Sequence, residues 1–130
     1  MAVLFDTSIA IHLRDETAAI GDQIANLTSQ AFLSAISRVE LEGGVAAVSE
    51  LASLRRAKLD VLLANLDVIE FTDEMAQVYG RIVMQSGYSR RKIIDRMIAA
   101  TALVHDLALV TTNGADFADI HGLKLEIWDL

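Results

Sequence analysis

The sequence predicts an α/β fold, in which a short, mainly parallel sheet of four to five strands is flanked by helices on both sides. Short apolar runs, typical of strands buried on both faces, alternate with longer segments whose apolar residues recur at helical spacing. Such alternation indicates parallel strands joined by helical crossovers. No repeat, linker or change of composition interrupts the pattern, so residues 1–130 are expected to form a single domain.

Short apolar runs locate five expected strands, and helical spacing locates six expected helices. The strands are residues 2–5, 31–36, 67–71, 107–112 and 123–128. The helices are residues 9–13, 18–27, 38–48, 50–66, 72–86 and 95–105. Ser37 is expected to open the third of these helices and Asp95 the sixth. Asn113 and Gly114 are expected to form a turn after the fourth strand.

The composition narrows the class of protein. The chain is 53% hydrophobic and contains no Cys, so a continuous core is expected, and disulfides and thiolate metal sites are excluded. The three His are too scattered to indicate a zinc motif. The apolar runs are far shorter than the ~20 residues of a membrane-spanning helix, and the first residues lack the basic leader of a secretory signal. A soluble cytoplasmic protein is therefore expected.

Four acids lie where a parallel sheet would bring them together. Asp6 directly follows the first expected strand, and Glu40 lies in the first helical turn after the second. Asp116 follows the fourth strand, and Asp95 begins the helix that leads into that strand. Ligands of open α/β sheets bind beyond the carboxyl ends of the strands. Oxygen ligands without His or Cys select Mg²⁺ or Mn²⁺, and two such ions activate water for phosphodiester cleavage.

Each acid also has an ordinary structural interpretation. Asp6 and Asp95 are suited to cap the helices that they precede. Ser37 and Glu40 have the spacing of a capping box, and Asp116 is compatible with an ordinary loop acid. The formal net charge of −7 also weighs against nucleic-acid binding. A metal-dependent nuclease remains compatible with this charge, because divalent cations neutralise a carboxylate cluster before phosphate binds.

Four sequence blocks resemble, in order and at similar intervals, those of the PIN-domain family, in particular the VapC-type toxins of toxin–antitoxin pairs. The blocks are Leu4-Phe-Asp6-Thr-Ser8, Ser34-Ala-Ile-Ser-Arg-Val-Glu40-Leu-Glu-Gly43, Asp95-Arg-Met-Ile-Ala-Ala100 and Leu109-Val-Thr-Thr-Asn113-Gly-Ala-Asp116-Phe117. The resemblance covers nearly the whole length of the chain. It implies a PIN-like α/β/α fold.

The resemblance also implies roles for individual residues. It makes Asp6, Glu40, Asp95 and Asp116 the catalytic and metal-binding acids. The supporting polar residues would be Thr7, Ser8, Thr112 and Asn113. The implied activity is Mg²⁺- or Mn²⁺-dependent endoribonuclease cleavage, often of tRNA or ribosomal RNA, which stops translation. The implied partners are an RNA substrate, a VapB-type antitoxin and a second copy of the chain.

Further features have both a functional and a structural interpretation. Arg90, Arg91 and Lys92 either contact RNA phosphates or form a solvated loop. The charged side chains of residues 55, 56 and 58 are expected to form the exposed face of an amphipathic helix. The leucines between residues 51 and 66 are expected to be core, with a portion available to an antitoxin helix or a dimer partner. Trp128 is expected to serve packing, and Glu42 to point away from Glu40.

Two alternatives to a nuclease remain. Phosphoryl transfer through an aspartyl phosphate also uses acids beyond parallel strands, but Asp6-Thr-Ser8 lacks the second Asp that such an opening requires. A non-catalytic PIN-like module that regulates through a DNA-binding partner is compatible with the acidic net charge. The complete set of four acids argues against that module, since a degenerate site would be expected to have lost one of them.

Overall fold

The computed structural model describes residues 2–130 and contains a five-stranded sheet whose paired strands are all parallel. The strands are β1 (Ala2–Phe5), β2 (Gln30–Ser34), β3 (Asp67–Ile69), β4 (Ala108–Thr111) and β5 (Leu125–Ile127). Their order in the sheet is β3-β2-β1-β4-β5, so β1 occupies the centre. The predicted α/β class is confirmed.

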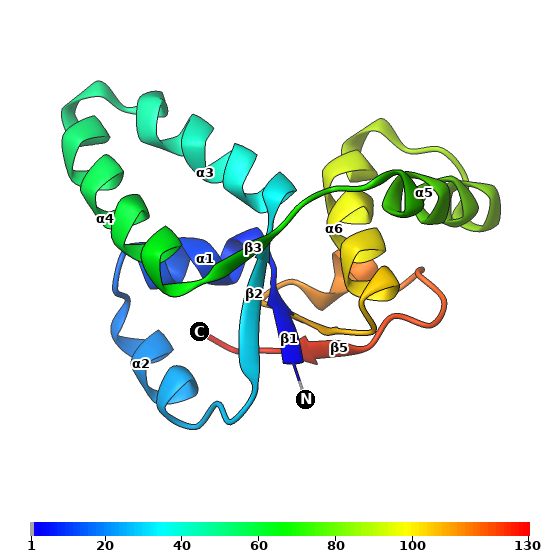
Figure 1. Cartoon of the computed structure of the whole chain (residues 1–130), viewed down its shortest axis with the longest axis horizontal. Helices are drawn as coiled ribbons and strands as arrows, with labels where there is room; N and C mark the ends of the chain where they lie inside the picture. Colours follow the sequence, from blue (N-terminus) through cyan, green and yellow to red (C-terminus); the bar gives the residue numbers. More distant parts are fainter. Residues whose placement is uncertain (1) are drawn as a thin grey trace.

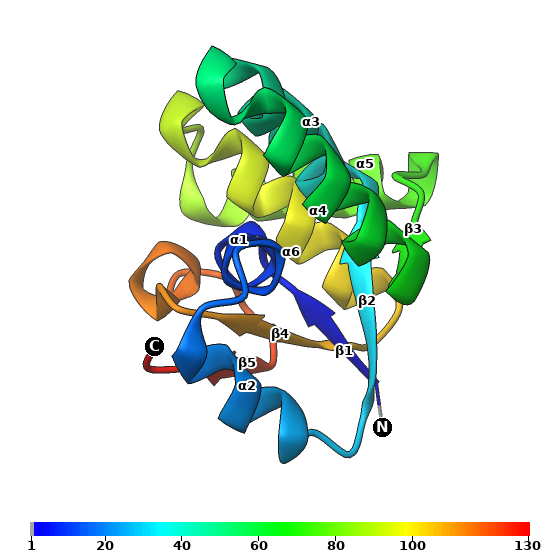
Figure 2. The same cartoon turned by 90° about the vertical axis from the view of Figure 1, so that its left-hand side faces the viewer.

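Helices and short 3-10 turns connect these strands. The helices are α1 (Thr7–Arg14), α2 (Ala18–Ala25), α3 (Ala35–Ala47), α4 (Ala52–Asn65), α5 (Asp73–Ser86) and α6 (Ile93–Val104). The 3-10 turns are η1 (Ser49–Leu51), η2 (Arg90–Lys92) and η3 (Gly114–Phe117). In Figure 1, α1, α2 and α4 lie on one side of the sheet and α5 and α6 on the other. The view in Figure 2 shows α1 and α2 on the near side of the sheet.

Alternate residues of β1 bury their side chains in different cores, because successive side chains of a strand point to opposite faces. Val3 and Phe5 pack in the same cluster as Ile9 of α1 and Ile20 of α2. Leu4 packs in another cluster with residues of α5 and α6. The central strand is therefore covered on both faces, as its apolar sequence indicates.

The third expected helix begins earlier than the sequence pattern predicts. Helix α3 starts at Ala35, and the side chain of Ser34 caps it by accepting a 3.0 Å hydrogen bond from the Ile36 backbone N–H. The prediction that Ser37 opens the helix and forms a capping box with Glu40 is therefore wrong. Ser37 is instead buried within the helix, and Glu40 lies in its second turn.

The charged face predicted for α4 is wrong in part. Arg55 donates to the Gly44 carbonyl oxygen of α3 at 2.8 Å, and Arg56 forms ion pairs with Glu42 and Asp60. These side chains therefore join α4 to α3 rather than extend freely into water. The leucine stripe is also only partly core: Leu59 and Leu62 are buried, whereas the side chains of residues 51 and 54 are exposed.

Other boundaries differ by small amounts. Helix α6 begins at Ile93, so Asp95 lies in its first turn instead of starting it. The expected turn at Asn113 and Gly114 leads directly into η3. Trp128 is buried as expected, with its ring edge-to-face against Phe5 at a centroid distance of 5.6 Å.

The strand order defines where ligands would bind. From β1 the chain proceeds to β2 and β3 on one side, and the remaining strands, β4 and β5, continue the sheet on the other. The order therefore reverses between β1 and β4, and open α/β sheets bind ligands beyond the strand ends at such a switch point. Across residues 2–130, the structure has no helix that is both long and apolar enough to cross a membrane.

Candidate active site

Asp6 lies at the switch point, directly after β1, and its carboxylate is held by three donors. Thr111 Oγ1 donates to Asp6 Oδ2 at 2.7 Å, and Ser8 Oγ donates to the same oxygen at 3.2 Å. The Thr7 backbone N–H donates to Asp6 Oδ1 at 2.8 Å. Only 6% of the residue is exposed. Burial raises the pKa of Asp6, although these hydrogen bonds act in the opposite direction.

The segment after β4 holds Asp116 in place. Asn113 Nδ2 donates to Asp116 Oδ2 at 2.6 Å. The Asn113 backbone N–H donates to Thr111 Oγ1 at 3.0 Å, so the Thr111 hydroxyl connects this segment to Asp6. The repulsion from Asp116 contributes to the raised pKa of Asp6, which indicates that the two carboxylates are close.

Glu40 reaches the site from α3 through Thr7. Thr7 Oγ1 forms hydrogen bonds with Glu40 Oε1 at 2.6 Å and with Ser37 Oγ at 2.9 Å. Since Thr7 also contacts Asp6 through its backbone N–H, its two polar groups join the acids of β1 and α3. Glu42 points elsewhere, as expected, and pairs with Arg56 and Arg38.

Asp95 of α6 is the acid whose protonation is most strongly perturbed. Its pKa is raised from 3.8 to about 6, first by burial and then by the negative charges of Asp6, Asp116 and Glu40. Lys92 acts in the opposite direction. Contacts through Thr111 and Thr7 join Asp6, the segment of Asp116 and Glu40 beyond the ends of β1 and β4. The charges of these three acids contribute to the raised pKa of Asp95 in the first turn of α6, which indicates that Asp95 lies near the same group.

The carboxylates do not form a complete ligand set as they stand. Among residues 2–130, no group of three Asp, Glu or His side chains is arranged to hold a metal ion. Glu40 and Asp116 are instead turned toward Thr7 and Asn113. The chemistry of the donors nevertheless fits a hard divalent cation, because all four are carboxylates and their mutual repulsion favours a positive charge among them.

The basic segment before Asp95 divides into two parts. Arg90 and Arg91 are exposed, whereas Lys92 forms an ion pair with Asp119 Oδ2 at 3.2 Å. Arg96, the residue after Asp95, is buried and pairs with the same Asp119 oxygen at 3.2 Å. Lys92 is thus not a freely solvated side chain, whereas the exposure of Arg90 and Arg91 is compatible with either interpretation of this segment.

Several residues of the site were not identified from the sequence. Thr111, Ser37 and Arg96 are buried polar residues that contact the acids or the segments carrying them. Thr112, which the resemblance suggested, contributes its backbone N–H to Ser8 Oγ at 3.2 Å. Thr111 could have been noticed in the sequence as a polar residue at the end of an otherwise apolar strand. Arg96 could have been noticed as a charged residue within the apolar sequence of α6.

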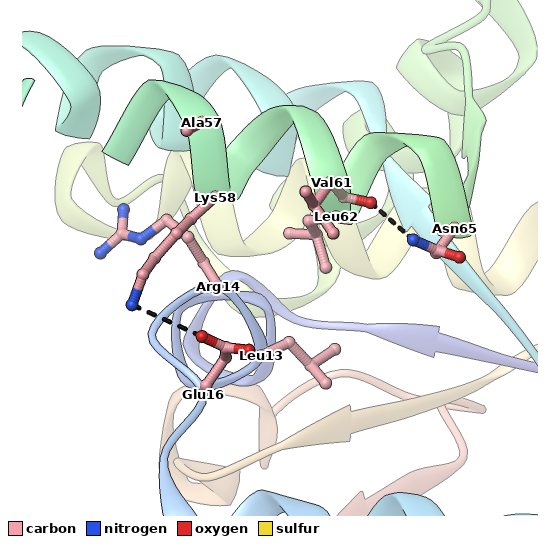
Figure 3. Close-up of a pocket in the computed structure, with 8 residues that line it drawn as sticks. All are labelled: Leu13, Arg14, Glu16, Ala57, Lys58, Val61, Leu62 and Asn65. Carbon is pink, nitrogen blue, oxygen red and sulfur yellow. Dashed lines mark hydrogen bonds and ion pairs between the residues drawn. The ribbon is translucent and has the colours of Figure 1, made fainter. Parts of the chain in front are cut away.

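An apolar pocket of about 300 Å³ lies away from the acids, between the end of α1 and α4. It is lined by Leu13, Arg14, Glu16, Ala57, Lys58, Val61, Leu62 and Asn65. Figure 3 shows Lys58 and Glu16 paired across it, with Val61 and Leu62 presenting apolar surface. None of the four acids lines this pocket, so it is separate from the candidate active site.

Comparison with known proteins identifies the class to which this fold and site belong. The family model for the PIN domain matches residues 3–123. Ribonuclease VapC19 of Mycobacterium tuberculosis is 38% identical over 119 residues, which cover 88% of this chain and 90% of the relative. The chain therefore belongs to the PIN-domain family, and its relatives there are VapC-type proteins.

Two further similarities support that assignment. Ribonuclease VapC2 of Rickettsia felis is 32% identical over 101 residues, covering 75% of this chain and 73% of the relative. A solved structure of VapBC2 from Rickettsia felis, bound to a DNA fragment from its promoter, matches with a TM-score of 0.86. That match has 26% identity and covers 99% of this chain and 100% of the other.

Proposed function

We propose that this chain is the endoribonuclease toxin of a toxin–antitoxin pair and that it hydrolyses RNA phosphodiester bonds with the help of Mg²⁺ or Mn²⁺. The observation that carries the proposal is the hydrogen-bond network in which Thr111 joins Asp6 to the segment of Asp116 and Thr7 joins Asp6 to Glu40. The raised pKa of Asp95, to which the charges of these three acids contribute after burial, supports its belonging to the same group. Membership of the PIN-domain family and similarity to proteins named ribonuclease VapC support the same activity.

The residues proposed to hold the cation are Asp6, Glu40, Asp95 and Asp116. A divalent ion there would activate water, stabilise the leaving oxygen and offset the charge of the RNA phosphate. The acids alone would repel that phosphate. Because the cation would neutralise them, a chain with a net charge of −7 is compatible with an RNA substrate.

The chain's own residues orient the acids. Thr111 and Ser8 donate to one oxygen of Asp6, and the Thr7 backbone N–H donates to the other. These contacts fix the direction in which the carboxylate points. Asn113 does the same for Asp116. The exposed Arg90 and Arg91 are proposed to bind RNA phosphates beside the acids, a contact that positions the strand without reading its sequence.

The proposed partners are a VapB-type antitoxin and a second copy of the chain. The complex of Rickettsia felis VapBC2 supports a VapB-type protein as partner. We propose the apolar pocket between α1 and α4 as its docking groove, because an amphipathic helix of a partner would cover Val61, which is 64% exposed. A Val61→Glu variant should keep cleaving RNA when a VapB-type antitoxin that inhibits the wild type is added.

The nuclease is tested by incubating total RNA with purified, partner-free protein in Mg²⁺, in Mn²⁺ and in EDTA. We expect discrete fragments with either metal and none in EDTA. If water attacks the phosphorus and the 3′ oxygen leaves, the fragments should carry 5′-phosphate and 3′-hydroxyl ends. Products ending in a 2′,3′-cyclic phosphate would instead indicate attack by the RNA's own hydroxyl.

Matched variants distinguish the site from a contaminant. Asp6→Asn and Asp95→Asn should abolish the fragments, whereas Asp22→Asn, at an exposed acid of α2, should cleave like wild type. Folded protein that leaves RNA intact with both metals would contradict the proposed activity. It would favour the non-catalytic regulatory module instead.

A further inference from the structure

We propose that Arg96 is a positioning residue for RNA cleavage, whose buried guanidinium holds together the segments that carry Asp95, Asp116 and the two exposed arginines. The expected effect of Arg96 on RNA cleavage rests on the proposed function. The contacts of Arg96 with the three segments are independent of that function.

Three segments meet at the Arg96 side chain. Arg96 itself belongs to α6 and directly follows Asp95. Its Nη1 donates to the Gly87 carbonyl oxygen at 2.6 Å, where α5 ends and the segment with Arg90 and Arg91 begins. Its Nη2 donates to Asp119 Oδ2 at 3.2 Å, two residues beyond the end of η3. A single planar group therefore bridges all three segments.

Neighbouring contacts connect the same segments. Ser86 Oγ donates to the Asp119 carbonyl oxygen at 2.8 Å, and Lys92 Nζ approaches Asp119 Oδ2 at 3.2 Å. Asp119 thus receives contacts from the end of α5, from η2 and from α6. Gly87 has a φ of +83°, a backbone conformation that favours glycine and turns the chain sharply at the point where Arg96 binds it.

The burial of Arg96 indicates a role other than simple stabilisation. The residue is only 1% exposed, and its Nε is buried without a hydrogen-bond partner within the described part of the chain. Burying a charge is costly, and an apolar residue of similar volume often stabilises a fold as well or better. An arginine is nevertheless useful here, since its rigid fork of donors can bind a carbonyl and a carboxylate at once.

The test compares two variants with a matched control. Arg96→Lys keeps the charge but lacks the planar fork that reaches both Gly87 and Asp119. Asp119→Asn alters the exposed end of the cluster and leaves Arg96 in place. Arg55→Lys is the control, because Arg55 also donates to a glycine carbonyl oxygen, that of Gly44, but joins α4 to α3.

Amide hydrogen exchange gives the readout that does not depend on catalysis. We expect faster exchange in residues 87–92 and 113–119 of Arg96→Lys, with exchange in β1 and β2 unchanged. Asp119→Asn should show the same pattern to a smaller degree, and Arg55→Lys should not show it. Exchange that is unchanged, or that rises uniformly across the chain, would overturn the proposal.

Kinetics on a defined RNA then measure the effect on activity. We expect kcat/KM of Arg96→Lys to fall by about 10- to 100-fold, as for other misplaced catalytic groups. KM should rise as well, since Arg90 and Arg91 lose their position, and binding in EDTA should show a weaker salt dependence. A fall in kcat that only matches the loss of folded protein, with KM and salt dependence unchanged, would mean that Arg96 only stabilises the fold. If the wild type does not cleave RNA, the proposed function is contradicted. The exchange experiment then still tests whether Arg96 holds the three segments together.

Discussion

Thr111 donates a 2.7 Å hydrogen bond to Asp6 and so joins the ends of the two strands between which the sheet order reverses. Both residues are buried, and the Thr111 hydroxyl also accepts from the Asn113 backbone N–H. One hydroxyl therefore sets the orientation of Asp6 and the start of the segment that carries Asp116. Loss of the Thr111 hydroxyl should therefore impair RNA cleavage more than it impairs folding.

Replacing Thr111 with Val tests this relationship. Valine keeps the shape but removes the hydroxyl, which leaves the Asn113 backbone N–H without this acceptor and Asp6 Oδ2 with Ser8 as its remaining donor. We expect stability to fall by about 1–2 kcal/mol. Cleavage of a defined RNA should fall by about 10- to 100-fold, because Asp6 loses its orientation. Denaturant unfolding and initial cleavage rates measure the two effects separately.

Thr101→Val provides the matched control. Thr101 is equally buried and donates to the Met97 carbonyl oxygen at 3.0 Å within α6, away from the strand ends. It should lose a similar amount of stability and retain most of its activity. Equal losses of activity in the two valine variants would contradict a specific role for Thr111.

The repulsion on Asp95 predicts a pH dependence of stability. Its pKa of about 6 in the folded protein lies above the ordinary value of 3.8, so the folded state holds more protons between these values. The free energy of unfolding should therefore decrease as pH rises from about 4 to 6. In EDTA at pH 7.5, Asp95→Asn should be more stable than wild type by about 1–2 kcal/mol, a value reduced for partial exposure.

Denaturant unfolding of both proteins at pH 4, 5, 6 and 7.5 measures this contribution. The difference between them should be small at pH 4, where Asp95 is protonated in the folded state and still about 40% protonated in the unfolded state. It should reach its full size above pH 6. An Asp95→Asn variant that is less stable than wild type at pH 7.5 would mean that the charged carboxylate stabilises the fold.

Cation binding should be visible as a thermal shift without any RNA. A ligand at 100 times its dissociation constant stabilises the folded state by about 2.7 kcal/mol, and we expect the Tm to rise by about 5–10 °C in saturating Mn²⁺. Asp6→Asn should lose this increment without a lower Tm in EDTA, since the change also removes a repulsive buried charge. Asp22→Asn should retain the increment, and a shift that survives Asp6→Asn would place the cation elsewhere.

The contact between Phe5 and Trp128 predicts how the residues after β5 contribute to stability. Trp128 is buried and packs edge-to-face on the central strand's Phe5. Trp128→Ala should destabilise the protein by about 3–5 kcal/mol, whereas Trp128→Phe should cost less because it retains an aromatic contact. Chemical unfolding of both variants measures the difference, and an alanine variant as stable as wild type would contradict this packing role.

The sequence predicted the fold well because the strands consist mainly of apolar residues that are buried in the structure. The run Ala2–Phe5 is apolar throughout, and the structure covers it on both faces, so its pattern identified β1 correctly. Helix starts were harder to predict. Ser34 and Ser37 are both able to cap a helix, and only tertiary contacts decide between them, because Ser37 is used to bind Thr7.

The sequence predicted which acids form the candidate site, but it did not predict the contacts that hold these acids in place. Asp6 and Asp116 follow strands, so topology alone predicted that they lie at the same edge of the sheet, whereas the position of Asp95 depended on where its helix starts in space. Thr111 and Arg96 act through contacts 105 and 23 residues apart in sequence, and no local pattern reveals such pairs. For the same reason, the pairing of Lys92 with Asp119 was not expected from a basic run.

We propose that the four acids form one cation-dependent nuclease centre. The most direct test of this centre is the cleavage rate of a single defined RNA in Mn²⁺ by wild type, by the conservative variant of each acid, and by Asp22→Asn. We expect Asp6→Asn, Glu40→Gln, Asp95→Asn and Asp116→Asn each to lose at least about 100-fold in rate, while Asp22→Asn cleaves like wild type. Wild-type rates in Asp95→Asn, or cleavage that persists in EDTA, would contradict it.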